Sequence, residues 1–406
     1  MEPLLYLVHR IPYPPNKGDK IRSFHLLQHL VQRYRVYLGT FVDDPADLQY
    51  LEPLREFCAE VKIEQINPRA ARLRSLTGLF NGEALTVPYY RNAQMRRWVD
   101  SIVAKQAIRQ AVVFSSAMMQ YVLDRPGLRV VADFVDVDSA KWAQYADEHK
   151  WPASLLYRRE AVRLLAFERA AAARSAACVL VTPMEVKLFA SLAPEHAEKL
   201  HAIGNGVDAE YFCPRADRLS PFVEGEKALV FTGVMSYWPN VDAVTWFAQA
   251  IFPRIAAVQP QARFYVVGMD PSPAVKDLGR DPRVVITGKV ADVRPYVQHA
   301  DVVVAPLRIA RGVQNKVLEA MAMERPVVVS TAAAQGVGGQ AGVDFETAET
   351  ADEFADCVLR LMAHDRGRKL GEQARRRVSR DYSWETNLAA FGRLLAATGV
   401  AVPAQG

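Results

Sequence analysis

Lys316 and Glu319 stand three positions apart in a stretch whose residue types could bind a nucleotide. The apolar runs at residues 301–307 and 326–331 predict two neighbouring parallel strands, joined by a helix over about 314–323. Amide groups at the start of such a helix favour phosphate, and Lys316 in its first turn adds a full positive charge. Glu319, one turn later, would accept hydrogen bonds from a ribose. The simpler interpretation is a surface Lys–Glu pair, which stabilises a helix by only about 0.2–0.5 kcal/mol.

The polar turn before this helix contains Arg311, Gly312 and Asn315. Turn and helix together resemble the donor-binding motif of the family 4 retaining glycosyltransferases, whose two Rossmann-like domains form the GT-B architecture. That motif has two glutamates separated by seven residues; Glu319 matches the second, and Arg311 stands in place of the first. The resemblance implies that Glu319 contacts the ribose and that Arg311 or Lys316 binds the diphosphate. Gly312 and Asn315 complete the expected donor site, and recognition of the donor sugar is left open.

The loop after the first predicted strand contains Lys17, Gly18, Lys20 and Arg22. Ligands of open α/β domains bind beyond the strand ends, and the three basic side chains are expected to make this place electropositive. Gly18 opens the next helix and lets another molecule approach the backbone. The family resemblance places this glycine close to the donor diphosphate or the acceptor. The alternative is a turn with solvated lysines.

Asp136 and Asp138 follow the run at residues 129–135 and alternate at period two, so we expect them on one face, where repulsion would raise the pKa of one of them. Many members of the resembled family have a histidine at this strand end that contacts the donor sugar. Either aspartate could orient a sugar hydroxyl or take the proton of the acceptor. A metal is not expected, because no other ligand type is nearby. Ser139 is the candidate cap of the following helix.

Two loops of the second half add to the expected donor site. Gly233 follows the first strand of that half and would admit a phosphate close to the backbone, and Asn240 or Ser236 is expected to cap the next helix. Family members often carry an Arg and a Lys in this loop, and neither is present here. Val290 matches the family loop whose backbone reads the nucleobase, so it is a candidate for the base site.

Short β-rich runs alternate with helical stretches along the whole chain, which predicts parallel sheets with helices on both faces. We expect an α/β fold of two Rossmann-like, doubly wound domains in the GT-B arrangement: residues 1–208 on the acceptor side and residues 209–382 for the nucleotide-sugar donor. The resemblance implies that residues 383–406 form a helix that crosses back onto the first domain. The predicted strands cover residues 4–9, 36–42, 61–66, 112–115, 129–135 and 178–182, then 228–234, 263–268, 284–287, 301–307 and 326–331.

Length and composition set limits on the function. A chain of 406 residues suits two domains, and 50% hydrophobic with 23% charged residues is typical of a folded protein. The net charge is 50 − 45 = +5, which is too small and too scattered to indicate a nucleic-acid partner. The four cysteines lack metal-ligand or disulfide spacing, and no apolar run approaches the roughly 18 residues that span a bilayer. We therefore expect a cytoplasmic protein.

Two helical segments leave alternatives open. Glu168 lies on a partly apolar stripe of a helix predicted over residues 154–173, where it either faces a ligand or pairs with Arg163 or Arg169. Residues 69–80 mix basic and apolar side chains at a weak helical period. We favour an amphipathic helix docked on the first sheet. The alternative is contact with anionic lipid headgroups, which would make the protein peripheral on the cytoplasmic face of the inner membrane.

Three motifs in order, around Gly18, Asp136 and Lys316, resemble the sugar transferases associated with exosortase (PEP-CTERM) exopolysaccharide systems. The leading hypothesis is a retaining glycosyltransferase that moves a sugar from a nucleotide diphosphate to a saccharide acceptor, expected to be lipid-linked. Asp136, Asp138 and Lys316 are its candidate catalytic residues, Lys316 by neutralising the leaving diphosphate. No cofactor and no metal are expected. The alternatives are a nucleotide-sugar epimerase on the same scaffold and a non-catalytic sugar-nucleotide-binding protein; a nicotinamide oxidoreductase is disfavoured because neither first strand is followed by Gly-x-Gly-x-x-Gly.

Overall fold

The chain folds into two α/β units in a computed structural model that describes residues 1–15, 18–310, 312–363 and 365–397. Unit 1 comprises Met1–Gly204 and the terminal segment from Asn387 onward, and unit 2 comprises Asn205–Thr386. The expected division lay after residue 208 with a return at residue 383. Each unit has its own apolar core, as expected for chains of this length.

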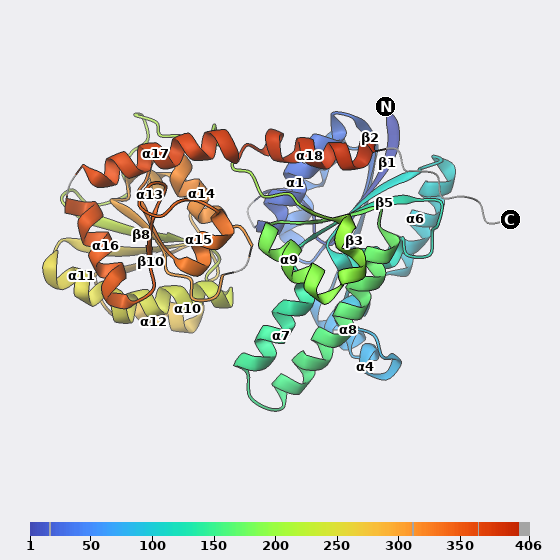
Figure 1. Cartoon of the computed structure of the whole chain (residues 1–406), viewed down its shortest axis with the longest axis horizontal. Helices are drawn as coiled ribbons and strands as arrows, with labels where there is room; N and C mark the ends of the chain where they lie inside the picture. The colour runs from blue at the N-terminus through green and yellow to red at the C-terminus, as the bar shows by residue number, and fades with distance from the viewer. Residues whose placement is uncertain (16–17, 311, 364, 398–406) are drawn as a thin grey trace. The chain divides into compact units, whose positions relative to one another are not determined.

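Unit 1 is built on a parallel sheet of seven strands in the order β3-β2-β1-β4-β5-β6-β7 (Figure 1). Apolar residues fill β1 and β4 almost completely, because strands in the middle of a parallel sheet are buried on both faces. Its strands are β1 (Glu2–Val8), β2 (Tyr34–Val42), β3 (Glu60–Gln65), β4 (Gln110–Phe114), β5 (Arg129–Val135), β6 (Ala177–Leu180) and β7 (Leu200–Ala202).

Unit 2 repeats this plan with six parallel strands in the order β10-β9-β8-β11-β12-β13. In both sheets the first strand of the unit lies beside the fourth, so the strand order reverses between β1 and β4 and between β8 and β11. Ligands of doubly wound folds bind at such a reversal, beyond the carboxyl ends of the strands. The strands are β8 (Lys227–Thr232), β9 (Ala262–Val267), β10 (Val284–Gly288), β11 (Val302–Ala305), β12 (Val327–Ser330) and β13 (Glu346–Ala348).

Helices connect the parallel strands in both units. Those of unit 1 are α1 (Gly18–Val31), α2 (Leu51–Phe57), α3 (Pro68–Ser75), α4 (Thr77–Asn81), α5 (Thr86–Tyr89), α6 (Ala93–Lys105), α7 (Asp138–Glu148), α8 (Ala153–Arg174) and α9 (Pro183–Leu192). Those of unit 2 are α10 (Trp238–Trp246), α11 (Phe252–Val258), α12 (Pro273–Leu278), α13 (Arg294–His299), α14 (Asn315–Ala322), α15 (Thr331–Val337), α16 (Ala351–Ala363) and α17 (Arg366–Asp381). Figure 1 shows the unit 2 sheet between α13, α14 and α17 on one side and α10, α11 and α12 on the other.

The last helix, α18 (Trp384–Ala396), contains the return to unit 1. Thr386 N donates to the Ser383 hydroxyl at 3.4 Å, so Ser383 supplies a side-chain cap at the start of this helix. Further along, the guanidinium of Arg129 donates to the carbonyl oxygens of Leu394 and Leu395 at 2.8 and 3.1 Å. This cation therefore satisfies carbonyls at the C-terminal end of the helix, where the helix dipole is negative.

Candidate functional site

Lys316, the second residue of α14, lies beside the carboxyl end of β8. Its Nζ donates to Oδ1 of Asn240 at 2.6 Å and lies 4.0 Å from the centroid of the Phe231 ring. A Cβ atom on Gly233 would lie 3.3 Å from this Nζ and 2.7 Å from Nδ2 of Asn240. The absence of a side chain at Gly233 therefore provides the space that the Lys316 and Asn240 side chains occupy. The amino group of Lys316 lies where the strand order of unit 2 reverses.

Burial weakens the ionisation of both charged residues of α14. Desolvation lowers the pKa of Lys316 to about 7, against the opposing attraction of Glu319. Desolvation likewise raises the pKa of Glu319 to about 7, against the attraction of Lys316. An anionic ligand beside Lys316 would favour its ammonium form and raise that pKa again. The surface-pair interpretation is wrong, because both side chains are partly buried and Lys316 bonds to Asn240 rather than to the solvent.

The turn that leads into α14 contains three more residues of the expected donor site. Gly312 adopts a left-handed backbone with φ of 64°, and a Cβ on Gly336 of α15 would lie 2.0 Å from its carbonyl oxygen. Asn315 is the first residue of α14, and its Oδ1 accepts a hydrogen bond of 3.1 Å from Nδ2 of Asn205. Arg311 lies outside the described residues. Val290 follows β10 and packs, partly buried, against the core of unit 2.

Asn240 has a different role from the one expected of it. α10 begins at Trp238, and neither Asn240 nor Ser236 caps it. Nδ2 of Asn240 instead donates to the carbonyl of Val234 at 2.9 Å, which orients the amide so that Oδ1 faces Lys316. The capping prediction is wrong because the side chain lies inside the first turn and points across to α14. Asn205 and Asn240 are thus supporting residues of this site whose roles the sequence did not reveal.

In unit 1, the basic residues after β1 are neutralised by acids. Lys20 Nζ bonds to Asp47 Oδ2 at 2.6 Å, and Arg22 binds Asp133 through Nε and Nη2 at 2.8 and 3.2 Å. Both cations are about 1% exposed. The expectation that Lys20 and Arg22 form an electropositive ligand site is therefore wrong, since burial of a charge requires a partner of opposite sign. Gly18 is exposed as the first residue of α1, and Lys17 lies outside the described residues.

Asp136 and Asp138 share one cation rather than repelling each other on a strand. β5 ends at Val135, and Asp138 is already the first residue of α7. Nζ of Lys141 bonds to Asp136 Oδ2 at 2.8 Å and to Asp138 Oδ1 at 3.1 Å. The predicted period-two alternation is wrong at this point, because the chain has left the strand.

Three neighbouring strands of unit 1 end in polar side chains that have a buried atom without a hydrogen-bond partner in the described part of the chain. These atoms are Nδ1 of His9 after β1, Oγ of Ser116 after β4 and Oδ1 of Asp136 after β5. The ring of His9 stacks on Phe114 at a centroid distance of 5.8 Å. Buried polar atoms are normally bonded, so this strand edge is suited to a polar ligand. His9 and Ser116 were missed, although His9 closes a predicted strand at its carboxyl end.

The backbone is strained at two positions on the same edge. Ser115, after β4, has φ of 77°, and Val135, the last residue of β5, has φ of 68°. A positive φ is a strong outlier for a β-branched residue. Such strain persists only where the surrounding structure enforces it, and it clusters at functional sites. At Val135 it redirects the chain immediately before Asp136.

Glu168 is a structural residue of α8. It is about 1% exposed and accepts hydrogen bonds from the Ser139 amide and hydroxyl at 3.2 and 2.5 Å. Both alternatives expected for it are wrong, because Arg169 pairs with Glu195 and Glu168 turns inward to Ser139. Burial raises the pKa of Glu168 to about 8. Ser139 holds Glu168 and does not cap α7, whose N-cap is Val137.

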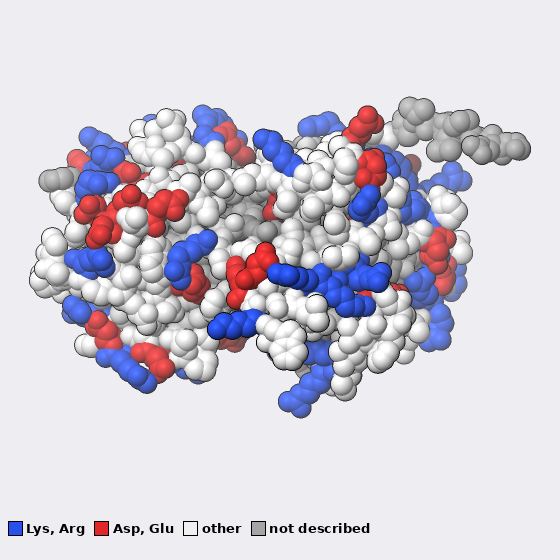
Figure 2. Space-filling model, turned by 60° about the horizontal axis from the view of Figure 1, so that its bottom comes forward, with Lys and Arg blue, Asp and Glu red and all other residues white. Residues whose placement is uncertain are grey.

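Several further observations concern only the residues that the structure describes. None of their helices is both long and apolar enough to cross a membrane. No group of three or more His, Cys, Asp or Glu side chains within them is placed to hold a metal ion. All four cysteines carry free thiols. On the face that Figure 2 shows, acidic and basic side chains are intermixed, in keeping with the small net charge.

Comparison with known proteins identifies the type of domain that unit 2 forms. Residues 226–364 match the family model described as Glycosyl transferases group 1. No curated protein matches the chain. Unit 2 therefore carries a glycosyltransferase domain, so the expected enzyme class is confirmed at the level of this domain.

Solved structures match nearly the whole chain. HepE of Anabaena in complex with UDP and glucose matches with a TM-score of 0.71 at 15% identity, over 98% of this chain and 100% of that chain. Sucrose-phosphate synthase of Thermosynechococcus elongatus gives 0.74 at 18% identity, over 97% and 98%. WaaG, a glycosyltransferase involved in lipopolysaccharide biosynthesis, gives 0.66 at 15% identity, over 97% and 100%. The predicted fold class is confirmed: two parallel-sheet α/β domains of the GT-B type.

Proposed function

We propose that the protein is a retaining glycosyltransferase that moves a sugar from a nucleotide diphosphate to a saccharide acceptor. The observation that carries the proposal is the position of Lys316, held by Asn240 beside Gly233 at the strand-order reversal of a glycosyltransferase domain. A diphosphate bound there would meet an ammonium group and the amides at the start of α14. HepE was solved with UDP and with UDP-glucose, which supports a nucleotide-sugar donor for this chain as well.

The donor site combines Lys316 with the rest of its turn. Glu319 binds the ribose, as the family resemblance implies, and the backbone of Val290 contacts the nucleobase. Arg311, Gly312 and Asn315 complete the turn, with Gly233 allowing a phosphate to approach the backbone. The negative charge that develops on the departing diphosphate is stabilised by Lys316, and electrostatic stabilisation of this kind is often the largest single contribution to catalysis.

The strand edge of unit 1 supplies the groups that handle sugar hydroxyls. Asp136 has a buried oxygen without a partner in the described chain, and Lys141 fixes its other oxygen. We assign to Asp136 the role of orienting a hydroxyl or accepting the acceptor's proton, a role that typically contributes about 10²–10⁴-fold in rate. Asp138, tied to the same Lys141, is the alternative. Gly18, which is exposed at the start of α1, lets the donor diphosphate or the acceptor approach the backbone.

The reaction so defined needs no cofactor and no metal, since Lys316 neutralises the leaving group. The acceptor is a lipid-linked saccharide of exopolysaccharide biosynthesis, as the exosortase-type resemblance implies. A protein that uses such an acceptor would work at the cytoplasmic face of the inner membrane as a peripheral protein.

A screen of sugar nucleotides with and without a saccharide acceptor tests the proposal. A transferase releases free nucleotide only when the acceptor is present, whereas an epimerase converts the donor without it. Asp136→Asn and Asp138→Asn variants add a second criterion. A transferase loses turnover in at least one of them while its nucleotide affinity stays unchanged. If both variants keep full activity, the assignment of these residues is wrong; if no sugar nucleotide is consumed with any acceptor, a non-catalytic binding protein replaces the proposal.

A further inference from the structure

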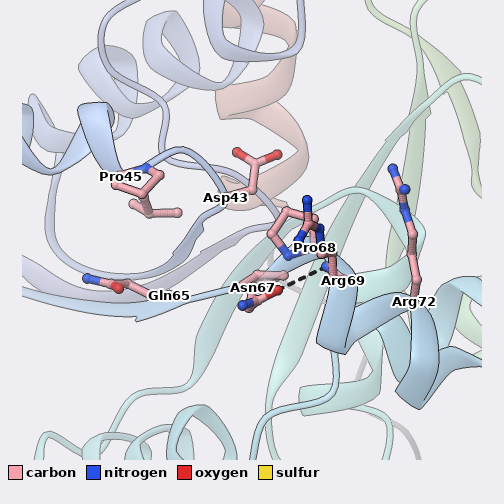
Figure 3. Close-up of a pocket in the computed structure, with 9 residues that line it drawn as sticks. Asp43, Pro45, Gln65, Asn67, Pro68, Arg69 and Arg72 are labelled. Carbon is pink, nitrogen blue, oxygen red and sulfur yellow. Dashed lines mark hydrogen bonds between the residues drawn. The ribbon is translucent and has the colours of Figure 1, made fainter.

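A pocket of about 700 Å³ opens in unit 1 at the carboxyl ends of β2 and β3 (Figure 3). Val42 and Gln65, the last residues of these two strands, form part of its lining. Arg69 and Arg72 of α3 form another part. A crevice beyond the carboxyl ends of parallel strands is the usual place for a ligand in this type of fold.

The charge of this pocket is positive. Within the described chain, neither the Arg69 nor the Arg72 guanidinium forms an ion pair, and both residues are exposed. The pocket's one acid, Asp43, accepts from Nη2 of Arg10 at 2.9 Å, and Arg10 also bonds to Asp19, so the excess of positive charge comes from the two arginines of the lining. Asn67 is occupied as the cap of α3 and accepts from Arg69 N at 3.0 Å. Two planar guanidinium groups without partners are suited to a phosphate or carboxylate, which they can bind in a bidentate manner.

An apolar strip continues from these arginines along the same side of the helix. Arg69, Arg72, Leu73 and Leu76 follow the i, i+3, i+4, i+7 spacing of one helix face. Leu76 has helical backbone angles, and α4 starts at the next residue, so Phe80 extends the face. Leu73 is 71% exposed and Phe80 is 91% exposed. The opposite face is the buried one, with Ala71 and Ser75 on α3 and Gly78 on α4.

The segment at residues 69–80, expected as one docked amphipathic helix, forms the two short helices α3 and α4, and its outer face carries exposed apolar side chains next to the two arginines. An apolar strip that starts beside a cationic pocket has the chemistry of a molecule with an anionic head and a hydrocarbon tail. An acid saccharide would use the arginines and leave Leu73, Leu76 and Phe80 without a function. For this reason the lipid-borne anion is favoured.

We propose that this pocket binds the diphosphate of a lipid-linked acceptor through Arg69 and Arg72, with its hydrocarbon chain along Leu73, Leu76 and Phe80. The proposal rests on the proposed transferase function and names the acceptor's anchoring group.

Binding of farnesyl diphosphate, inorganic pyrophosphate and farnesol to the full-length protein tests this assignment. Titrations are made with a saturating nucleoside diphosphate, so that the donor site is filled. We expect farnesyl diphosphate to bind more tightly than either of the other two. The Arg69→Gln/Arg72→Gln variant should bind farnesyl diphosphate at least about tenfold more weakly, since it lacks both charge-assisted contacts. Arg97→Gln is the control, because Arg97 is an exposed arginine of α6 outside the pocket.

A second variant tests the contacts of the hydrocarbon chain separately from those of the diphosphate. The Leu73→Gln/Phe80→Gln variant should bind farnesyl diphosphate more weakly than the wild type and pyrophosphate with unchanged affinity. Because both residues are exposed, we expect its melting temperature to be unaltered. Equal affinity of the arginine variant and the wild type for farnesyl diphosphate would overturn the proposal. So would arginine-dependent binding of glucuronate without binding of farnesyl diphosphate, or arginine-dependent binding to anionic vesicles that lack any polyprenyl lipid. If no nucleotide binds to the protein, the proposed transferase function is contradicted. The affinities for farnesyl diphosphate then still decide whether this pocket binds a lipid diphosphate.

Discussion

Nζ of Lys316 and Oδ1 of Asn240 lie 2.6 Å apart, although 76 positions of sequence separate the two residues. The contact joins the first turn of α14 to the first turn of α10. It fixes the ammonium group at the reversal of the unit 2 sheet, and it gives a desolvated lysine the hydrogen bond that its burial requires.

Replacing Asn240 by alanine removes that acceptor. We expect Asn240→Ala to lower the free energy of unfolding by about 1–3 kcal/mol, because a buried donor is left unsatisfied. Affinity for a nucleoside diphosphate should fall as well, since the ammonium group is no longer held in place. Urea denaturation and calorimetric titration measure the two effects. Asn240→Asp is the comparison variant: it keeps the acceptor for Lys316 but loses the Nδ2 donor to Val234, so it should restore stability only in part, while its charge opposes the diphosphate. An Asn240→Ala protein that matches the wild type in both measurements contradicts this role.

Nucleotide affinity should depend on pH through Lys316. Its pKa in the free protein is about 7, against 10.5 for an exposed lysine, and a bound diphosphate raises it. Above pH 7 the free protein has therefore lost a proton that the complex regains. Binding takes up this proton, so the affinity decreases with rising pH, by up to about tenfold per pH unit.

Titration calorimetry between pH 7.5 and 9 measures this effect, because the nucleoside diphosphate is already fully ionised there. Buffers with different ionisation enthalpies report the number of protons taken up. Lys316→Arg is the matched variant, since a guanidinium keeps its charge over the whole range and the dependence should vanish. A wild-type affinity that stays constant from pH 7.5 to 9 would show that Lys316 does not meet the diphosphate.

Arg22 and Asp133 should act on stability rather than on ligand affinity. Both side chains are about 1% exposed and pair with each other. Arg22→Met leaves a buried carboxylate without its partner and should cost about 3–5 kcal/mol of unfolding free energy. The double variant Arg22→Met/Asp133→Leu removes both charges and should recover most of this loss. Chemical denaturation of the three proteins gives the answer, and an Arg22→Met protein as stable as the wild type would show that the pair contributes nothing.

The central strands could be predicted because burial on both faces leaves a continuous apolar run. Val302–Ala305 and Val327–Ser330 are such runs, and both were predicted as strands from the sequence. β7 and β13 were missed, since Leu200–Ala202 and Glu346–Ala348 are three residues long and mix polar with apolar side chains. Only pairing with β6 and β12 makes them strands.

The site could be predicted where its signal is local. Lys316 and Glu319 share one helix, so their spacing and the preceding strand place them together. Partners far away in the sequence left no such signal. Asp133 lies 111 positions from Arg22, and without knowledge of that partner Arg22 was interpreted as a ligand-binding cation. Asn240 was taken for a cap, because its contact with Lys316 exists only after the sheet has formed.

The affinity of the folded protein for nucleoside diphosphates, measured for wild type, Lys316→Glu and Glu319→Ala, tests the central claim most directly. Lys276→Glu on α12 is the control, because it changes the same charge at an exposed position of unit 2. We predict that Lys316→Glu weakens binding at least about tenfold, that Glu319→Ala weakens it less, and that Lys276→Glu leaves it unchanged. Folded Lys316→Glu and Glu319→Ala proteins that retain wild-type affinity for every nucleoside diphosphate tried would contradict the account.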